Sequence, residues 1–161
     1  MSVRNLIASI LLGLLCAVAV AEDVPDQDTI TWYVQAGAYT HFSDDEKYEE
    51  APLFAGVERQ NEKKTIIGFS VFNNSFGDMT QFLYWGKQWN PWENHRALRI
   101  KLTIGVFHGY EGENQDVTPI YWGDAWGIGA VPTFGYQKNR LGFDLGLLGN
   151  SGVVFLVGYE F

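Results

Sequence analysis

The sequence predicts an all-β fold, an eight-stranded antiparallel transmembrane β-barrel, and three observations support this prediction. From Thr31 onward, apolar side chains recur at every second position, and glycine or polar residues interrupt the pattern about every ten residues. One face of each clear strand is apolar, whereas the other carries charges or glycine. The chain ends at Phe161, and apolar residues precede it at every second position, a pattern typical of barrels that cross the outer membrane.

The first 21 residues have the pattern of a secretory signal peptide. Arg4 precedes an apolar run, residues 6–20, and the run ends in the small-residue pattern at which such peptides are cleaved. We therefore assign residues 1–21 to the signal peptide and residues 22–161 to one barrel domain. Cys16 is the only cysteine, so the exported domain is expected to fold without a disulfide.

The composition narrows the classes of partner. A formal net charge of −8 makes nucleic acid an unsuitable partner, but it does not argue against a membrane. Aromatic residues make up 16% of the chain and charged residues only 19%, and there are 18 glycines. A water-soluble domain of this size would leave much of that apolar surface exposed, so the composition favours a lipid environment.

The first three strands are separated by connections of different length. Residues 31–42 form the first strand and precede the long acidic connection 43–52, whereas residues 53–60 form the second and precede the short turn 61–63. Residues 64–72 form the third strand, which ends at the stretch FNNSFG. Asparagine, serine and glycine are common turn residues, so this stretch is expected to begin a loop.

The fourth and fifth strands repeat this arrangement. Residues 80–89 form the fourth strand and end at the short turn 90–95. Residues 96–109 form the fifth strand, in which leucine, isoleucine and valine alternate with polar residues that include Arg99 and Lys101. The long acidic connection 110–124 follows, so short and long connections continue to alternate.

The last three strands complete an even number. Residues 125–136 form the sixth strand, and the short turn 137–139 leads into the seventh, residues 140–148, where leucine and phenylalanine alternate with glycine and aspartate. The tight hairpin 149–151 leads into the eighth strand, residues 152–161. Both ends of the barrel domain are therefore expected beside the short turns, and the loops after the odd-numbered strands at the opposite end.

The charged faces distinguish two all-β architectures. In a soluble β-sandwich, which is the alternative fold, the apolar face would form the core and the charged face would meet water. In a membrane barrel the apolar face meets lipid, and Arg99, Lys101, Asp144 and Glu160 point into the lumen. We favour the barrel, because closure also leaves no strand edge unpaired in lipid.

Many glycines share the inward parity. Eight strands enclose an interior that side chains fill or that holds one small ligand. Inward glycines are compatible with relief of strain at bends, or with a slot for a slim apolar ligand. The inward glycines are Gly37, Gly56, Gly68, Gly105, Gly127, Gly129 and Gly146.

A histidine and a serine are expected to meet at the end of the barrel that carries the loops. His41 ends the first strand and faces inward by parity, and Ser75 follows the third strand, its near neighbour in a small barrel. An imidazole can act as a general base toward a hydroxyl group, so the pair has the parts needed for acyl transfer. The alternative is that FNNSFG forms only a turn held by local hydrogen bonds.

These features resemble the PagP-type lipid A palmitoyltransferases, a family of small eight-stranded outer-membrane barrels. YTHFSDDEKYEEAP matches the family at its rim histidine, His41, and FNNSF matches a phenylalanine, a variable residue, an acid and a serine before an aromatic. Ser75 takes the place of the family serine and Asn74 that of its acid. The resemblance implies transfer of a palmitoyl chain from a phospholipid to lipid A, with no cofactor and no metal.

The resemblance also implies a cavity that holds the acyl chain, a floor that sets its length, and a gap between strands, marked by proline, that admits lipid. Pro132 is expected to mark that lateral gate, and Gly86 the floor. The expected partners are a phospholipid acyl donor and the lipid A acceptor in the outer membrane, and the barrel is expected to be a monomer. The residues expected to line the acyl-chain pocket are Gly37, Gly68, Gly86, Gly105, Gly127 and Gly129.

Two departures from the family pattern matter. Residues 22–28 are too few and too acidic to form the amphipathic helix with which that family commonly begins. Asn74 can fix a histidine tautomer, but it stabilises an imidazolium less than an aspartate does. Either the rate is lower, or Asp44, Asp45 or Asp78 supplies the negative charge.

Two other functions use the same features. A lipid A deacylase would use the same residue types with water as the acceptor, and a non-enzymatic barrel would bind surface partners through its acidic loops. The chain has no phosphate-binding loop and no G-x-S-x-G elbow, and its three histidines are too scattered for a metal site. His108 faces outward by parity, and the six tryptophans near strand ends predict aromatic girdles at the membrane interfaces.

Overall fold

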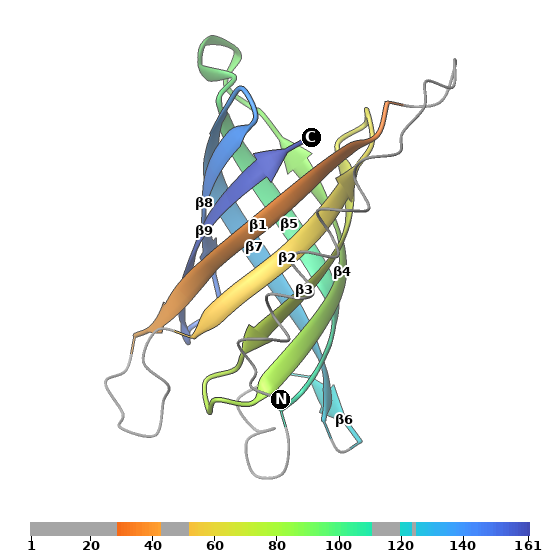
Figure 1. Ribbon diagram of the computed structural model, residues 1–161, viewed down its shortest axis with the longest axis vertical. Coiled ribbons are helices and arrows are strands. Elements are labelled where there is room, and N and C mark those ends of the chain that lie inside the picture. Colours follow the sequence, from red (N-terminus) through yellow and green to blue (C-terminus); the bar gives the residue numbers. More distant parts are fainter. Residues whose placement is uncertain (1–28, 43–51, 111–119, 124) are drawn as a thin grey trace.

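The chain folds into a closed barrel of antiparallel strands (Figure 1). The computed structural model describes residues 29–42, 52–110, 120–123 and 125–161, so the predicted signal peptide lies outside the described residues. Each strand pairs with its neighbours, and the β5–β7 and β1–β9 pairs complete the ring. The barrel strands are β1 (Thr31–His41), β2 (Leu53–Gln60), β3 (Thr65–Asn73), β4 (Met79–Trp89), β5 (Leu98–His108), β7 (Trp126–Lys138), β8 (Leu141–Leu147) and β9 (Gly152–Glu160).

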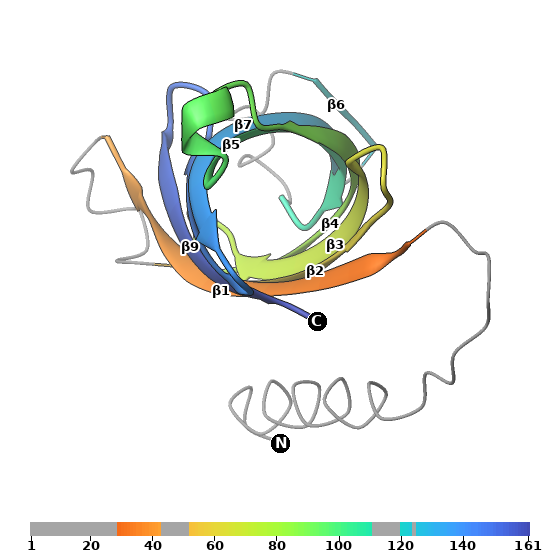
Figure 2. The same cartoon turned by 90° about the horizontal axis from the view of Figure 1, so that it is seen from above.

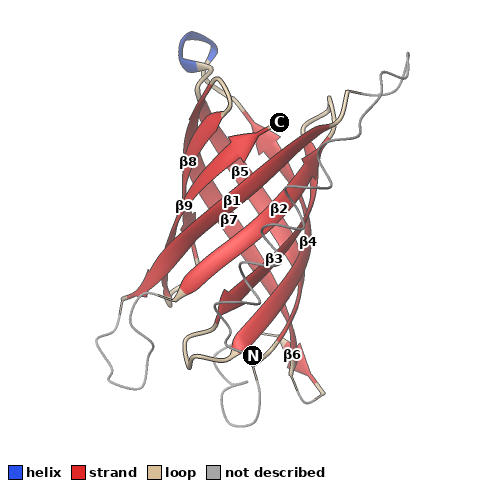
Figure 3. Cartoon of the chain, viewed as in Figure 1, coloured by secondary structure: helices blue, strands red, loops and turns tan. Residues whose placement is uncertain are grey.

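All eight predicted strands are confirmed, although their ends shift by one to two residues in most cases. Two short elements were not predicted. They are strand β6 (Tyr121–Trp122) and one turn of 3-10 helix, η1 (Glu93–His95). η1 is the only helix among the described residues (Figure 3). Figure 2, seen along the barrel, places β6 outside the ring of the other strands. No helix in the described ranges is long and apolar enough to cross a bilayer.

The two ends of the barrel differ. The turn end carries the β2–β3, β4–β5 and β7–β8 turns and both termini of the barrel, where the Trp32 N–H donates to the Phe161 carbonyl at 3.2 Å. The loop end carries the connections after β1, β3, β5 and β8. The predicted arrangement of short turns and termini is therefore confirmed.

The barrel is apolar outside and polar inside, the reverse of a soluble domain. Outward side chains such as Leu83 (60% exposed), Trp85 (55%) and Phe155 (56%) cover the exterior. The residues next to them in sequence point inward, and many are buried polar groups. This inversion is typical of a transmembrane barrel and excludes the sandwich alternative, whose apolar faces would be buried.

Four buried charged side chains fill the interior near the turn end. Arg99 binds Asp144 with two hydrogen bonds, Nε to Oδ1 at 2.9 Å and Nη2 to Oδ2 at 2.5 Å. Lys101 lies between the two carboxylates, 3.1 Å from Glu58 Oε2 and 3.3 Å from Asp144 Oδ2. Two cations thus meet two anions, and none of these residues is more than 5% exposed. We call these four residues the ion-pair plug.

Candidate active site at the loop end of the barrel

His41 and Ser75 are in hydrogen-bond contact. His41 is the last residue of β1 and points inward, and Ser75 lies in the turn between β3 and β4. His41 Nε2 and Ser75 Oγ are 2.9 Å apart. In the tautomer that carries its proton on Nδ1, the imidazole accepts the hydrogen bond from the serine hydroxyl. In this geometry an imidazole can accept the proton of a serine hydroxyl, as a base does toward a nucleophile.

Asn74 forms the turn that presents Ser75. Its side chain is fully buried, and its Oδ1 accepts hydrogen bonds from the backbone N–H of Phe76 at 2.9 Å and of Asp78 at 3.0 Å. Its Nδ2 donates to the Gly109 carbonyl at 2.8 Å, which ties the turn to the end of β5. The amide of Asn74 is thus engaged with backbone groups rather than with the imidazole.

The structure therefore corrects the expectation that Asn74 stands where an acid supports His41. An asparagine whose oxygen already caps two N–H groups stabilises a turn, as the alternative interpretation of FNNSFG expected. Its contribution is to hold Ser75 in place. Asp78 is exposed at the same turn, and Asp44 and Asp45 lie outside the described residues.

Two tyrosines that the sequence did not single out surround the serine. The Tyr39 hydroxyl donates to the Asn73 carbonyl at 3.2 Å and lies 3.5 Å from Ser75 Oγ, and its ring contacts that of His41 at 5.1 Å. The Tyr110 phenol lies near Ser75 and Tyr39 and interacts with both side chains. Burial raises the pKa of Tyr110, so the phenol stays protonated. The signal for Tyr39 was available, because it precedes His41 by two positions and shares its inward face.

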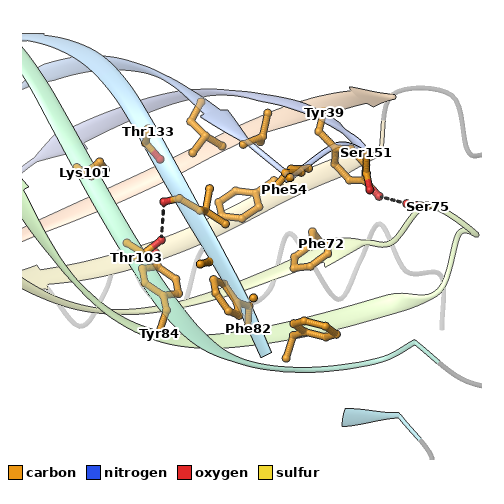
Figure 4. Close-up of a pocket in the computed structure, with 18 of the residues that line it drawn as sticks. Tyr39, Phe54, Phe72, Ser75, Phe82, Tyr84, Lys101, Thr103, Thr133 and Ser151 are labelled. Atoms are coloured by element: carbon orange, nitrogen blue, oxygen red, sulfur yellow. Dashed lines mark hydrogen bonds between the residues drawn. The ribbon is translucent and has the colours of Figure 1, made fainter. Parts of the chain in front are cut away.

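A cavity of about 780 Å³ lies beneath the His41–Ser75 pair. Its volume is within the range of about 300–1,000 Å³ that is usual for ligand pockets. Polar groups form its floor: Gln35, Glu58, Tyr84, Lys101, Thr103 and Thr133. Figure 4 shows Phe54, Phe72 and Phe82 between these groups and Ser75. Apolar side chains form the wall: Tyr39, Phe54, Phe72, Phe82, Phe107, Val131, Val154 and Leu156.

The prediction that glycines line the acyl-chain pocket is wrong for most of them. Of the six glycines expected in the pocket, only Gly129 lines the cavity. The others do face inward, but neighbouring groups cover them: a Cβ at Gly68 would lie 2.3 Å from the Tyr84 ring, and one at Gly127 2.3 Å from the Phe107 ring. These glycines make room for aromatic side chains, and the aromatic rings form the wall.

The remaining three glycines lie against backbone. A Cβ at Gly37 would meet the Phe155 carbonyl, and one at Gly105 the Leu83 carbonyl. At Gly86 it would meet the Leu102 carbonyl, so Gly86 is covered and is not the floor. The ion-pair plug and the polar residues beside it close the cavity instead.

The cavity also reaches the barrel wall beside β7. β8 pairs with β7 from Thr133 toward the turn end, and β6 pairs with β7 nearer the loop end. Residues 129–132 of β7 therefore have no described strand beside them on that side. The cavity lining at this place includes residues 129–131 and the hairpin 148–151.

Pro132 lies at the edge of this opening. On the side of β6 and β8, Ile128 N–H donates to the Ile120 carbonyl, whereas Gln137 N–H donates to Ala97 on the β5 side. Because these directions alternate along a strand, the Pro132 nitrogen faces the opening. Proline has no N–H, so this edge position lacks a backbone donor. Pairing with β5 continues through Pro132, so the opening lies on its β8 side only.

The other predicted interface residues lie on the exterior. His108 contacts Trp126 with ring centroids 4.6 Å apart, and Trp126 stacks on Trp122 at 6.5 Å. All six tryptophans are at least 38% exposed, as expected for aromatic girdles. His108 is thus a member of an outer aromatic cluster, apart from the cavity.

Comparison with known proteins adds little to this geometry. No family model and no curated protein matches the sequence. Among solved structures, the chain is similar to the N-terminal β-barrel domain of Pseudomonas aeruginosa OprF, with 11% sequence identity and a TM-score of 0.46. The match covers 84% of this chain and 100% of that domain. The assignment of the fold rests on the strand pairing described above.

Proposed function

We propose that this chain is an outer-membrane acyltransferase that moves a palmitoyl chain from a phospholipid to lipid A. The observation that carries the proposal is the 2.9 Å contact between His41 Nε2 and Ser75 Oγ at the mouth of an apolar cavity. A base and a hydroxyl at that distance are the essential parts of nucleophilic acyl transfer. The apolar exterior supports a place in the outer membrane.

The first step forms an acyl-enzyme. Ser75 Oγ attacks the ester carbonyl of the phospholipid while its proton passes to His41 Nε2. The bond between the carbonyl carbon and the glycerol oxygen then breaks, and that oxygen takes the proton from Nε2. The lysophospholipid leaves, and the acyl chain stays as an ester of Ser75.

The second step transfers the chain. A lipid A hydroxyl attacks the serine ester and gives its proton to His41 Nε2, and Ser75 Oγ leaves and takes that proton back. Negative charge develops on the carbonyl oxygen in both steps. Tyr110 and Tyr39 place phenol groups beside Ser75, where a protonated hydroxyl can donate to that oxygen.

The cavity supports an acyl chain as the group transferred. Each methylene buried from water contributes about 0.8 kcal/mol, and aromatic side chains supply most of the wall. The polar floor disfavours a chain that reaches the ion-pair plug, because the plug would then lose polar contacts without replacement. The floor therefore limits the length of the chain.

The opening beside Pro132 supports entry of the donor from the bilayer. A phospholipid that approaches β7 from outside meets an edge with no described partner strand. Its ester can then reach the His41–Ser75 pair while its chain enters the cavity. The donor need not leave the membrane.

The test is direct. The full chain is purified in detergent and incubated with phosphatidylcholine carrying a labelled palmitoyl chain and with lipid A. The expected result is labelled lipid A with one added palmitoyl unit, and loss of nearly all turnover in His41→Ala and Ser75→Ala. Mass spectrometry of Ser75 under single-turnover conditions is expected to detect the palmitoyl ester.

The same assay separates the competing functions. Loss of an acyl chain from lipid A, without gain of label, would identify a deacylase and overturn the proposal. Neither transfer nor hydrolysis, with a correctly folded barrel, would identify a non-enzymatic binding barrel. His108→Ala is the matched control, because it removes an imidazole at the same end of the barrel but on the exterior.

A further inference from the structure

The positive charges of the described residues are divided between two places. Arg99 and Lys101 are buried in the ion-pair plug. The other seven basic residues are all exposed, and each lies in a turn at the turn end or within two residues of a strand end there. They are Arg59, Lys63, Lys64, Lys87, Arg96, Lys138 and Arg140.

The described acidic residues do not cancel this charge. Glu62 and Glu93 are the exposed ones at the turn end. Glu160 is near the same end, but it faces the interior and its Oε2 accepts a hydrogen bond from Gln137 Nε2 at 3.0 Å. The turn end is therefore a basic surface, and it adjoins the apolar exterior of the barrel.

Two of these cations border a groove on the outer surface. The groove has a volume of about 500 Å³ and crosses β7, β8 and β9 at the turn end. The strand register places Tyr136 opposite Phe143, and Leu141 opposite Tyr159, so an apolar floor crosses the three strands. Its residues are Tyr136, Lys138, Asn139, Arg140, Leu141, Phe143 and Tyr159.

The polar side chains of the groove lie at the hairpin tip, and most of its apolar side chains lie further from the tip. Lys138, Asn139 and Arg140 form the hairpin tip, where Asn139 adopts a left-handed conformation with φ of 57°. Arg140 and Tyr159 both line the groove, so the charged side chain at the tip borders the apolar floor. Tyr136 and Phe143, 43% and 51% exposed, lie further from the tip. The charged tip of the groove thus adjoins apolar side chains that lie further along the strands.

We propose that this groove binds a phospholipid with an anionic headgroup, in the leaflet at the turn end. Lys138 and Arg140 bind the phosphate, with the amide of Asn139 as a further donor, and an acyl chain packs on Tyr136, Phe143 and Leu141. Charge complementarity identifies the occupant, since a zwitterionic headgroup repels the same cations that attract its phosphate. The site lies outside the barrel, so this binding does not depend on acyl transfer.

The experiment measures lipid preference. The full chain in detergent micelles is titrated with phosphatidylglycerol or with phosphatidylcholine of identical acyl chains, and bound lipid is counted by native mass spectrometry. The unmodified protein is expected to bind phosphatidylglycerol more tightly. Each cation near an anionic lipid changes the affinity about fivefold. Lys138→Gln/Arg140→Gln is therefore expected to lower the affinity for phosphatidylglycerol about 25-fold, and the affinity for phosphatidylcholine much less.

Arg59→Gln/Lys63→Gln is the matched control, because it removes the same charge from the turn end outside the groove. It is expected to weaken phosphatidylglycerol by less than about threefold. An equal loss in both double variants would overturn the site, since a diffuse basic surface would then explain the preference. Equal binding of the two lipids by the unmodified protein would also overturn it.

Folding is checked by the shift in gel mobility on heating. If the double variant does not fold, Lys138→Gln alone serves, because it changes an exposed side chain that makes no side-chain hydrogen bond to another described residue. That variant is expected to weaken phosphatidylglycerol about fivefold. No change in a folded Lys138→Gln protein would contradict the proposal.

Discussion

The ion-pair plug is expected to stabilise the barrel through the balance of its charges, and Asp144→Asn tests this. Asp144 accepts two hydrogen bonds from Arg99 and lies 3.3 Å from Lys101. The substitution leaves both buried cations with Glu58 as their only anion in the plug. Breaking a buried pair in this way costs about 3–5 kcal/mol, because the charge left behind is neither hydrated nor neutralised. The equilibrium constant of unfolding is then expected to rise by roughly two to three and a half powers of ten.

A second substitution distinguishes charge balance from simple loss of contacts. In Asp144→Asn/Arg99→Gln the plug is neutral again, so the double variant is expected to be more stable than Asp144→Asn alone. The two substitutions should then show a coupling energy of about 1–3 kcal/mol. Glu93→Gln is the control, since it removes an exposed carboxylate and is expected to change stability by less than about 0.5 kcal/mol.

The assay is urea unfolding in phospholipid vesicles, followed by tryptophan fluorescence and by gel mobility. Both signals are expected to give the same midpoint for each variant. An Asp144→Asn barrel within about 1 kcal/mol of the unmodified protein would refute the reasoning, because water would then have to reach the plug. A double variant that loses the sum of the two single losses would refute it too, since additivity means that the charges do not interact.

Three further predictions concern the site and its wall. Asn74→Asp is expected to lower both stability and turnover, because a carboxylate would then face the Gly109 carbonyl, to which the Asn74 amide now donates a hydrogen bond. A rise in kcat would contradict this expectation and indicate that an acid at position 74 supports His41. Gly68→Ala is expected to destabilise by about 1–3 kcal/mol in urea unfolding, since its Cβ would strike the Tyr84 ring, whereas Gly129→Ala, whose Cβ meets nothing closer than 3.4 Å, should be tolerated. Tyr110→Phe is expected to lower kcat about threefold to tenfold, with unchanged gel mobility, because the serine loses one neighbouring phenol hydroxyl.

The fold could be predicted from sequence because each strand carries its own information. Alternation of Leu98, Ile100 and Leu102 with Arg99 and Lys101 assigns two faces without any knowledge of the neighbouring strands. The lipid environment then decides which face points outward. Strand ends were less well defined, since turn residues allow pairing to stop at several adjacent positions.

The site was only partly predictable, because its contacts cross the barrel. His41 and Ser75 could be placed at one end from parity and connection length, and the structure brings them together. The pairing of Glu58 with Lys101, 43 positions apart, depends on strand register and stagger, which no local pattern reports. The prediction that glycines line the pocket was wrong for a similar reason. An inward glycine lines the cavity only if no neighbouring side chain covers it, and this depends on the residue on the paired strand. At Gly68 that residue is Tyr84, whose ring covers the glycine.

The stabilising ion pairs and the cavity lie at different positions along the barrel axis. Near the turn end, the plug and its tyrosine and glutamine partners join β1, β2, β4, β5 and β8 across the lumen. Near the loop end, polar contacts such as that between His41 and Ser75 lie at the mouth, and aromatic rings line an open cavity beneath them. The floor is shared, because Glu58 and Lys101 belong to the plug and also line the cavity. A deeper cavity would thus require the loss of a buried ion pair, so the depth of the cavity and the stability of the barrel are coupled. Thr103 and Thr133 line the same floor outside the plug, so smaller side chains at these positions are expected to deepen the cavity without breaking an ion pair.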